Sequence, residues 1–260
     1  MKTSAITLAQ SMFRVSRLED LWLLYTKAMA QYGFDKILYG RTCFLDGQSF
    51  GNDDDLVVLS NHDSGYVEYL LAEQQFRCSP MLRWSLENVG FQSWDVVSQW
   101  MRNGALSLEQ ENFVAANQKY GVVAGYTASF PVIKPNCRSV ASIAAKPGID
   151  QNQVNAIWEE YGHEIEHLCL CFNSCAAQLP QPTKSTDLTG RQFEVLSWVA
   201  AGKTSGEIAI ILGVSTTAVE KHLQNARRAL NVVTSAQAAT KAALLNQLYF
   251  FGNTEAPLAL

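Results

Sequence analysis

The sequence predicts an α+β protein in two parts: an N-terminal α/β/α sandwich and a C-terminal all-α domain of four helices in a helix-turn-helix arrangement. Helical and strand-like hydrophobic periods are mixed before residue 178, whereas only helical periods occur after residue 187. Between the two parts, residues 179–186 read LPQPTKST, a polar stretch with two prolines that is typical of a linker. We therefore expect domains at 1–178 and 187–260, joined by a linker at 179–186.

The composition excludes several classes of protein. Of the 260 residues, 48% are apolar and 17% are charged, with a net charge of −4, so the chain can bury a core and is not a disordered protein. No uncharged apolar run reaches the ~18–20 residues of a membrane span. Residues 1–14 lack the apolar stretch and the cleavage site of a signal peptide. We expect a cytoplasmic protein with no membrane association.

The six cysteines are sparse and have no CxxC spacing, so they favour free thiols in a reducing compartment. We expect them to pack as small apolar side chains. They are Cys43, Cys78, Cys137, Cys169, Cys171 and Cys175.

The N-terminal part is expected to mix helices with strands. Gly33 can end the first helix, Ser107 begins another helix as a capping box with Gln110, and Asp150 caps the last and longest helix. Two of the strands flank a turn at 134–136 and are expected to pair. Helices are expected at 18–31, 64–76, 81–88, 107–121 and 150–177, and strands at 36–44, 56–59, 126–133 and 138–145.

The C-terminal part carries clear signals for helix ends. Thr189 with Gln192 and Thr204 with Glu207 form two capping boxes, in which side chains satisfy free backbone amides at a helix start. Gly213 stands where a left-handed turn residue is easiest to place. A short helix, a glycine turn and a longer helix make up the helix-turn-helix arrangement. The four helices are expected at 189–202, 204–212, 216–230 and 235–247.

The third of these helices has an apolar and a polar face. Its apolar residues recur at 4-3-4 spacing from Val219 to Leu230 and are expected to pack inward. The polar face can hydrogen-bond base edges and phosphates in a major groove, although a solvated face of an ordinary bundle has the same pattern. The capping boxes and the glycine turn favour DNA binding. The polar face carries Glu220, Lys221 and Gln224, which are the candidate base readers, and Arg228; Lys203, Thr204, Thr216, Thr217 and Arg227 are placed to bind phosphates.

Residues 188–231, LTGRQFEVLSWVAAGKTSGEIAIILGVSTTAVEKHLQNARRALN, resemble the signature of LuxR-type DNA-binding domains. One departure is Gln192, where the family usually has glutamate, but glutamine still serves the capping box. The resemblance implies binding to double-stranded DNA. We expect a homodimer that reads a palindromic operator, because one short helix makes too few base contacts for useful specificity.

Residues 18–177 resemble the autoinducer-binding domain of quorum-sensing LuxR regulators. The matching positions are Pro80, Trp94, Gly121, Gly125 and Ser142, the last within the stretch A-S-I-A. The resemblance implies a pocket for an acyl-homoserine lactone, with apolar walls and a few fixed hydrogen-bond partners. The indole of Trp94 and the hydroxyls of tyrosines are suitable partners. The candidate ligand-binding residues are Tyr66, Tyr69, Phe76, Ser79, Trp94 and Ser142.

The family pattern Trp-x3-Tyr-x4-Tyr-x3-Asp-Pro is not intact in this chain. Ser79 stands at the aspartate position, Tyr66 at the tryptophan position and Leu70 at a tyrosine position. An aspartate would accept the amide proton of the ligand, whereas serine accepts it more weakly. Three inputs therefore stay open: an acyl or aromatic lactone, a different small signal, and a partner protein. Each aromatic candidate is also a normal core residue.

A second class of function rests on His163-Glu-Ile-Glu-His167, which matches the H-E-x-x-H motif of zinc hydrolases. A single helix cannot surround a metal with successive turns, and a catalytic zinc needs a third ligand from elsewhere. In the related regulators this region contributes to the dimer interface, so the motif is interpreted as helix surface. Cys171 and Cys175 continue the same face without changing that interpretation.

The sequence therefore predicts a regulator and not an enzyme. It has no G-x-S-x-G, phosphate-binding loop or dinucleotide fingerprint, so we expect no catalytic residues, no metal and no cofactor other than a small-molecule signal. A ligand enclosed in the first domain would stabilise one conformation and thereby change dimerisation or domain placement.

Overall fold

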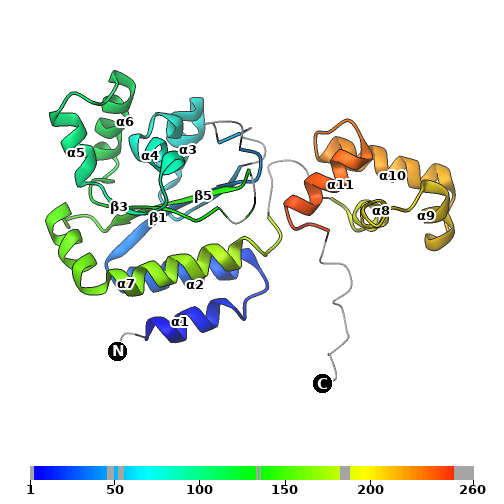
Figure 1. Cartoon of the computed structure of the whole chain (residues 1–260), viewed down its shortest axis with the longest axis horizontal. Coiled ribbons are helices and arrows are strands. Elements are labelled where there is room, and N and C mark those ends of the chain that lie inside the picture. Colours follow the sequence, from blue (N-terminus) through cyan, green and yellow to red (C-terminus); the bar gives the residue numbers. More distant parts are fainter. Residues whose placement is uncertain are drawn as a thin grey trace. The chain divides into compact units, whose positions relative to one another are not determined.

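The computed structural model describes residues 3–45, 50–51, 56–132, 134, 136–181 and 188–248, apart from the side chain of Glu73. The chain divides into two compact units, residues 1–177 and 178–260. The first unit is mixed α and β and the second is helical (Figure 1), which confirms the expected fold class. Residues 182–187, which include most of the expected linker and the expected start of the second domain, lie outside the described residues.

The first unit is built on one sheet with strand order β2-β1-β5-β4-β3, and every neighbouring pair is antiparallel. The pairing expected between the strands around residues 134–136 is confirmed as β4–β5, with Gly125 opposite Ala144 and Ser129 opposite Val140. Ile133 and Pro135, from the expected strand end and turn, lie outside the described residues. The strands are β1 Phe34–Thr42, β2 Val57–Ser60, β3 Gly90–Ser93, β4 Gly125–Ser129 and β5 Arg138–Ala145.

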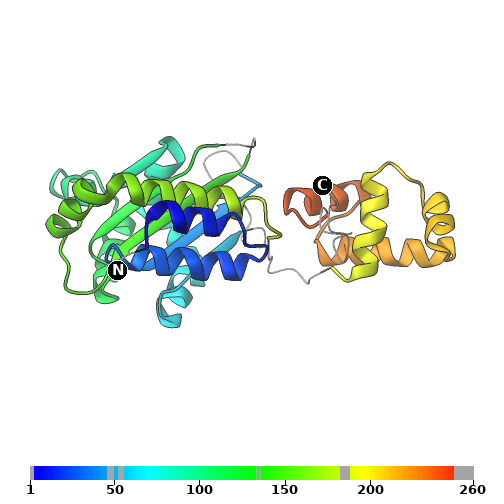
Figure 2. The ribbon, with the colours of Figure 1, turned by 90° about the horizontal axis from the view of Figure 1, so that it is seen from below.

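Helices cover both faces of the sheet, as the sandwich prediction requires. Figures 1 and 2 show α1, α2 and α7 together on one face, and Figure 1 shows α3 to α6 on the other face. Successive side chains of a strand point to opposite faces, so β1 can supply both layers. The helices are α1 Ala5–Met12, α2 Leu18–Ala30, α3 Ser64–Leu71, α4 Pro80–Glu87, α5 Asp95–Arg102, α6 Leu108–Lys119 and α7 Gln151–Ala176, with a 3-10 helix, η2, at Ala72–Cys78.

Several elements differ from the sequence prediction. The sequence does not predict α1, β3 or α5, which are eight, four and eight residues long. The helix expected at 64–76 stops at Leu71, and η2 follows it. Gln74 has a φ of 58°, a left-handed backbone conformation that cannot continue a right-handed helix. The expected helix was therefore too long by about one turn.

The layer between the sheet and α7 is an aromatic core. Tyr25 of α2 stacks on Phe172 of α7, with ring centroids 4.1 Å apart. The hydroxyl of Tyr39, on β1, donates a 3.0 Å hydrogen bond to Asn173 Oδ1 and lies 3.2 Å from Ser139 Oγ. Within the described part of the chain, no helix is long and apolar enough to span a bilayer.

The second unit consists of four helices. Both predicted capping boxes are confirmed: Thr189 with Gln192 at the start of α8, and Thr204 with Glu207 at the start of α9. The predicted glycine turn is also confirmed, because Gly213 ends α9 with a left-handed φ of 65°. The helices are α8 Gly190–Ala200, α9 Ser205–Leu212, α10 Thr216–Ala229 and α11 Ser235–Leu244, around a core that includes Val195, Leu196, Ile208, Val219, Leu223 and Ala226.

The first residues of the expected linker are bound to the end of the second unit. Asn246 Nδ2 donates to the carbonyl oxygen of Leu179 at 3.1 Å, and the Gln181 N–H donates to the Leu245 carbonyl at 3.0 Å. Gln247 Nε2 also donates to the Gln181 carbonyl at 3.1 Å. Leu179 and Gln181 are both buried. Residues 179–181 are therefore part of the folded second unit.

Candidate ligand pocket and nucleic-acid interface

A cavity of about 210 Å³ lies in the first unit between the sheet and helices α3 to α6. This is much more than the ~10–15 Å³ that one water molecule needs. Leucine, valine, methionine and aromatic side chains form most of its wall, and none of the described residues that line it is Asp, Glu, Lys, Arg or His. Burying an ion without a counter-charge is costly, so the cavity suits an uncharged and mostly apolar molecule.

The structure brings most of the predicted ligand-binding residues together around this cavity. Tyr66, Phe76, Ser79, Trp94 and Ser142 all line it. Tyr69, the sixth candidate, is not among the lining residues: its ring stacks on that of Tyr120, with centroids 5.5 Å apart. Tyr69 supports the wall from outside.

Tyr66 occupies one wall with its hydroxyl already engaged. The side chain is buried, at 5% exposure, and its hydroxyl donates a 3.0 Å hydrogen bond to Oδ1 of Asn117 on α6. Burial raises the pKa of the Tyr66 phenol above its usual value, so the group is neutral at all physiological pH values. Asn117 also lines the cavity. Asn117 was not predicted from the sequence, because it lies 51 positions from Tyr66 and no local pattern pairs the two residues.

A second polar group lies on the sheet side of the cavity. Trp94 Nε1 donates a 2.9 Å hydrogen bond to Oγ1 of Thr127 on β4, and Thr127 is directly opposite Ser142 of β5. All three side chains line the cavity. The Thr127 hydroxyl keeps its own proton for a further acceptor. The alternation of side chains along the predicted strand at 126–133 could have identified Thr127 as a residue on one face of the sheet.

Two side-chain amides of α7, those of Gln151 and Asn155, form hydrogen bonds with the residues next to Trp94. Gln151 Oε1 accepts from the Gly125 N–H at 2.9 Å, and Gln151 Nε2 donates to the Gly125 carbonyl at 3.2 Å. The same carbonyl accepts from the Trp94 N–H at 3.1 Å. Asn155 Nδ2 donates to Asp95 Oδ2 at 2.5 Å, and Asn155 Oδ1 accepts from Ser93 Oγ at 3.0 Å. The first turns of α7 thus fix the residues on both sides of the indole.

Gly125 makes this arrangement possible by its lack of a side chain. A Cβ at this position would lie 2.2 Å from the Ile143 carbonyl oxygen and 3.0 Å from the Trp94 ring. Both distances are shorter than normal van der Waals contacts, and the first involves backbone that cannot turn away. Glycine at this position therefore allows the indole to lie against the sheet.

Ser79 lines the cavity at the start of α4. Its Oγ accepts a 3.2 Å hydrogen bond from the Leu82 N–H and so caps the helix, with Pro80 in the first turn. A hydroxyl oxygen has a second lone pair and a proton, which remain for a ligand. A ligand amide can therefore donate to Ser79, but to a neutral acceptor and not to a carboxylate.

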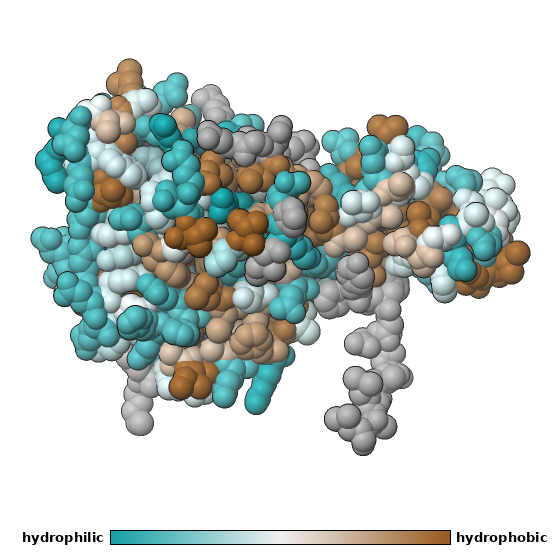
Figure 3. Space-filling view, viewed as in Figure 1, coloured by the Kyte–Doolittle hydropathy of each residue, from teal (hydrophilic) through white to brown (hydrophobic). Residues whose placement is uncertain are grey.

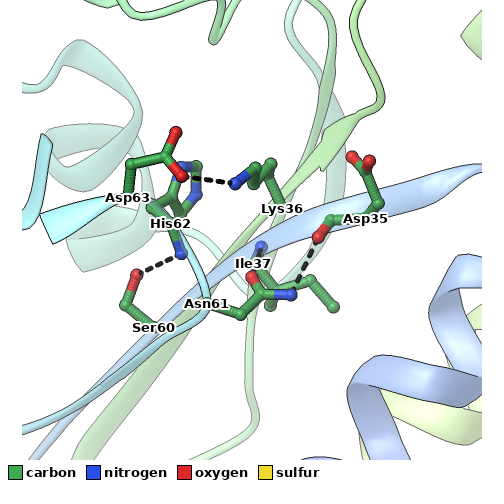
Figure 4. Close-up of polar contacts among 7 residues, drawn as sticks. All are labelled: Asp35, Lys36, Ile37, Ser60, Asn61, His62 and Asp63. Carbon is green, nitrogen blue, oxygen red and sulfur yellow. Dashed lines mark hydrogen bonds and ion pairs between the residues drawn. The ribbon is translucent and has the colours of Figure 1, made fainter.

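A polar corner joins β1 to the start of α3 (Figure 4). Asn61 accepts from the Ile37 N–H at 2.6 Å and donates to the Asp35 carbonyl at 2.8 Å, so one amide fixes the turn to the strand. His62 follows it and packs on Tyr66, with ring centroids 4.7 Å apart. Burial is the main cause that lowers the pKa of His62 from 6.5 to about 4, and the charge of Lys36 lowers it further, while Asp63 acts in the opposite direction.

The two histidines of the H-E-x-x-H motif are exposed on α7. His167 Nδ1 forms a 2.5 Å hydrogen bond with the His163 carbonyl oxygen, and Glu164 accepts one of 2.6 Å from the hydroxyl of Tyr32. Over the described ranges, no group of three or more His, Cys, Asp or Glu side chains is placed to hold a metal. The motif therefore forms part of the exposed surface of α7, and its Glu164 makes one contact with the turn after α2.

The candidate DNA-binding face is formed by α9 and α10 in the second unit. Val219, Leu223 and Ala226 of α10 are buried, so this helix presents its other face to solvent. Eight of the nine predicted DNA-binding residues are exposed, whereas Arg227 is half-buried. Figure 3 also shows apolar side chains at the α9 end of this unit, and Ile210 of α9 is 84% exposed. The exposed residues are Lys203, Thr204, Thr216, Thr217, Glu220, Lys221, Gln224 and Arg228.

Three polar groups of this face already have partners in the protein. The Thr204 hydroxyl donates to Glu207 Oε2 at 2.8 Å, and the hydrogen bond from the Thr204 N–H is the main cause that keeps the pKa of Glu207 below its usual value. Ser205 Oγ donates to Glu220 Oε1 at 2.5 Å. Arg227 Nη1 donates to Ser235 Oγ on α11 at 2.8 Å. Lys221, Gln224 and Arg228 are on the exposed part of α10.

Two family models match this chain over adjoining segments. The model described as "Autoinducer binding domain" matches residues 17–176, and the model described as "Bacterial regulatory proteins, luxR family" matches residues 186–242. The first match alone covers more than half of the chain.

Curated relatives and solved structures agree with these two matches. The transcriptional activator LuxR of Aliivibrio fischeri is 24% identical over 192 residues, which are 73% of this chain and 74% of that protein. The transcriptional activator AnoR of Acinetobacter nosocomialis is 26% identical over 92% of this chain and 96% of its own length. The crystal structure of Escherichia coli SdiA, at 19% identity, covers 94% of this chain and 97% of its own chain with a TM-score of 0.51, and so shares the fold.

Proposed function

This chain belongs to the LuxR family of quorum-sensing transcriptional regulators, and we propose on that premise that its first unit binds an uncharged acyl-homoserine lactone or a related signal. We further propose that it acts in the cytoplasm as a homodimer whose two second units bind a palindromic operator. Binding of the signal changes the population of the DNA-binding form. The protein thus acts by binding alone and catalyses no reaction.

The observation that carries the ligand proposal is the chemistry of the cavity wall. Its described lining residues are apolar or neutral polar, and they offer three separate groups to a ligand: Ser79, Asn117 and the pair Thr127–Ser142. An acyl chain needs the apolar wall, and the amide and carbonyl groups of a lactone need a few fixed partners. The chemistry is that of a neutral amphipathic molecule, with no charge to match a carboxylate or an amine.

The DNA proposal is supported by the exposed residues of α10. We propose that Gln224 and Lys221 read bases in the major groove, with Arg228 and Lys203 on the phosphates. Glu220 has one oxygen bound to Ser205 and the other available to a cytosine amino group. Two such helices in a dimer would read half-sites about one helical turn apart.

The test is thermal unfolding of the full chain against a panel of acyl- and aroyl-homoserine lactones, with DNA binding of the same samples followed by fluorescence anisotropy. A ligand that binds the folded state stabilises it by ~2.7 kcal/mol at a hundredfold excess over its dissociation constant. A rise of the midpoint with one member identifies the acyl class. No rise with any member, from protein that still binds DNA, refutes the lactone proposal and favours another signal or a partner protein.

Ser79→Asp provides a matched variant for this test. Aspartate caps a helix as well as serine does, so the start of α4 is expected to be retained. A carboxylate forms a stronger hydrogen bond with an amide N–H than a hydroxyl does. If the signal carries an amide at this position, Ser79→Asp should tighten its binding by about threefold to tenfold, whereas a signal without an amide should bind more weakly because it must face a buried charge.

A further inference from the structure

Two cysteines face each other at the end of the central strand pair. The register of β1 and β5 ends with Thr42 opposite Arg138. Continued by one position it sets Cys43 against Cys137, and the two thiols share a hydrogen bond. The strands stay together beyond this point, because the Leu45 N–H donates to the Asn136 carbonyl at 2.9 Å. Directly opposite residues of antiparallel strands have Cα atoms about 4.5–5.5 Å apart, which is within the range that a disulfide spans.

The two thiols interact with each other and lie in a positive environment. A hydrogen bond from Cys43 is the main cause that lowers the pKa of the Cys137 thiol to about 7, and the nearby charges of Arg41 and Lys134 lower it further. The same interaction raises the pKa of Cys43. Cys137 is therefore the nucleophile of the pair, with a substantial thiolate fraction at neutral pH, and Cys43 is its resolving thiol.

We propose that Cys43 and Cys137 form an oxidation site, at which a hydroperoxide converts the two thiols into a reversible intramolecular disulfide. In the first step the Cys137 thiolate attacks one peroxide oxygen, the O–O bond breaks, and a sulfenic acid forms while the other oxygen leaves as hydroxide or alkoxide. In the second step the sulfur of Cys43 attacks the sulfur of Cys137. The S–O bond breaks, and the departing oxygen takes the thiol proton and leaves as water.

Three other cysteines, all on α7, provide a comparison within the same chain. Cys169 is fully buried, and its Sγ shares a 3.2 Å hydrogen bond with the Tyr25 hydroxyl. Burial is the main cause that raises the pKa of Cys169 to about 12. Cys171 and Cys175 are four residues apart on α7, and burial raises the pKa of both. Both side chains project from the same face of one rigid helix, so their sulfur atoms cannot turn toward each other as those of opposite residues on two antiparallel strands can. Peroxide should therefore react with Cys43–Cys137 in preference to these three thiols.

The position of the pair connects it with α7. Alternation along β1 places Cys43 on the same face as Tyr39, whose hydroxyl donates to Asn173 near the end of that helix. Both cysteines are nearly buried, at 5% and 8% exposure, so a small hydroperoxide is a better oxidant for them than a bulky disulfide reagent. A covalent bond here would join the end of β1 to the start of β5.

The test treats the reduced, folded full chain with hydrogen peroxide and follows it by intact mass and by peptide mapping without reduction. The expected result is a loss of about 2 Da, a cross-linked peptide that contains Cys43 and Cys137, and full reversal by dithiothreitol. The initial rate should rise with pH and level off above about 7, where Cys137 is ionised.

Matched variants identify the site. Cys43→Ser should lose the 2 Da change and accumulate the sulfenic acid of Cys137, which a dimedone probe traps, while Cys171→Ser should behave like the unchanged chain. A disulfide that joins any other pair, or thiols that stay reduced in folded protein at the peroxide levels that oxidise free cysteine, would overturn the proposal. The result is independent of ligand and DNA binding, so it separates this inference from the proposed function.

Discussion

His62 should make this protein lose stability in mild acid, and the size of the effect follows from its surroundings. Its ring packs on Tyr66, and its Nε2 is buried with no hydrogen-bond partner in the described part of the chain. Burial, with the charge of Lys36, lowers its pKa from 6.5 to about 4. A difference of one in pKa corresponds to ~1.36 kcal/mol, so protonation of His62 costs the folded state about 3 kcal/mol.

The sign follows from which state binds the proton more readily. Above pH 6.5 His62 is neutral in both states, and its contribution to stability is fully present. As the pH falls from 6.5 toward 4, the unfolded chain takes up a proton that the folded chain excludes, so the free energy of unfolding decreases. Below about 4 both states are protonated and this loss is complete.

The assay is urea unfolding of the unchanged chain and of His62→Phe at several pH values between 8 and 4. Phenylalanine retains an aromatic ring against Tyr66 and cannot be protonated, so the two curves should separate by about 3 kcal/mol across that range. Lys36→Met should reduce the separation, since it removes a charge that lowers the pKa of His62. If unchanged chain and His62→Phe lose the same stability between pH 6.5 and 4, the account of His62 is wrong.

Three further predictions concern the pocket and the DNA face. Gly125→Ala should destabilise the first unit by about 2 kcal/mol or more in denaturant unfolding, because its Cβ meets the strand backbone, whereas Gly65→Ala, in open space on α3, should be neutral or stabilising. Asn155→Ala should weaken ligand binding about tenfold in calorimetry by loosening the residues beside the indole, and an unchanged affinity would remove it from the positioning role. In operator selection, Gln224→Ala should relax sequence preference at one position of each half-site, while Lys203→Ala should weaken binding to all sequences about equally.

Features governed by near neighbours in the sequence could be predicted well. The capping boxes at Ser107, Thr189 and Thr204 depend on residues three positions apart, and all three are present. The left-handed Gly213 was also predictable, because few other residues adopt that conformation at low cost. These local signals were enough to define the helix-turn-helix unit.

Features governed by distant contacts could not be predicted. β3 has four residues, all of them partly exposed, so it shows no alternation to detect and owes its existence to pairing with β4. The partner of Tyr66 on α6 and the partner of Trp94 on β4 are 51 and 33 residues away. Tyr69 shows the limit of spacing arguments, since it lies one turn of helix from Tyr66 and yet does not line the cavity.

The hydrogen bonds of Asn246 determine which residues an isolated DNA-binding fragment of this protein must include. A linker boundary read from the prolines would place the start of an isolated DNA-binding fragment near residue 187. Such a fragment would lack the carbonyl of Leu179 and the backbone of Gln181, and would leave the amides of Asn246 and Gln247 and the carbonyl of Leu245 without these partners. Chimeric regulators built on this chain should therefore exchange parts at residues 177–178, so that the short buried segment travels with the helices it completes.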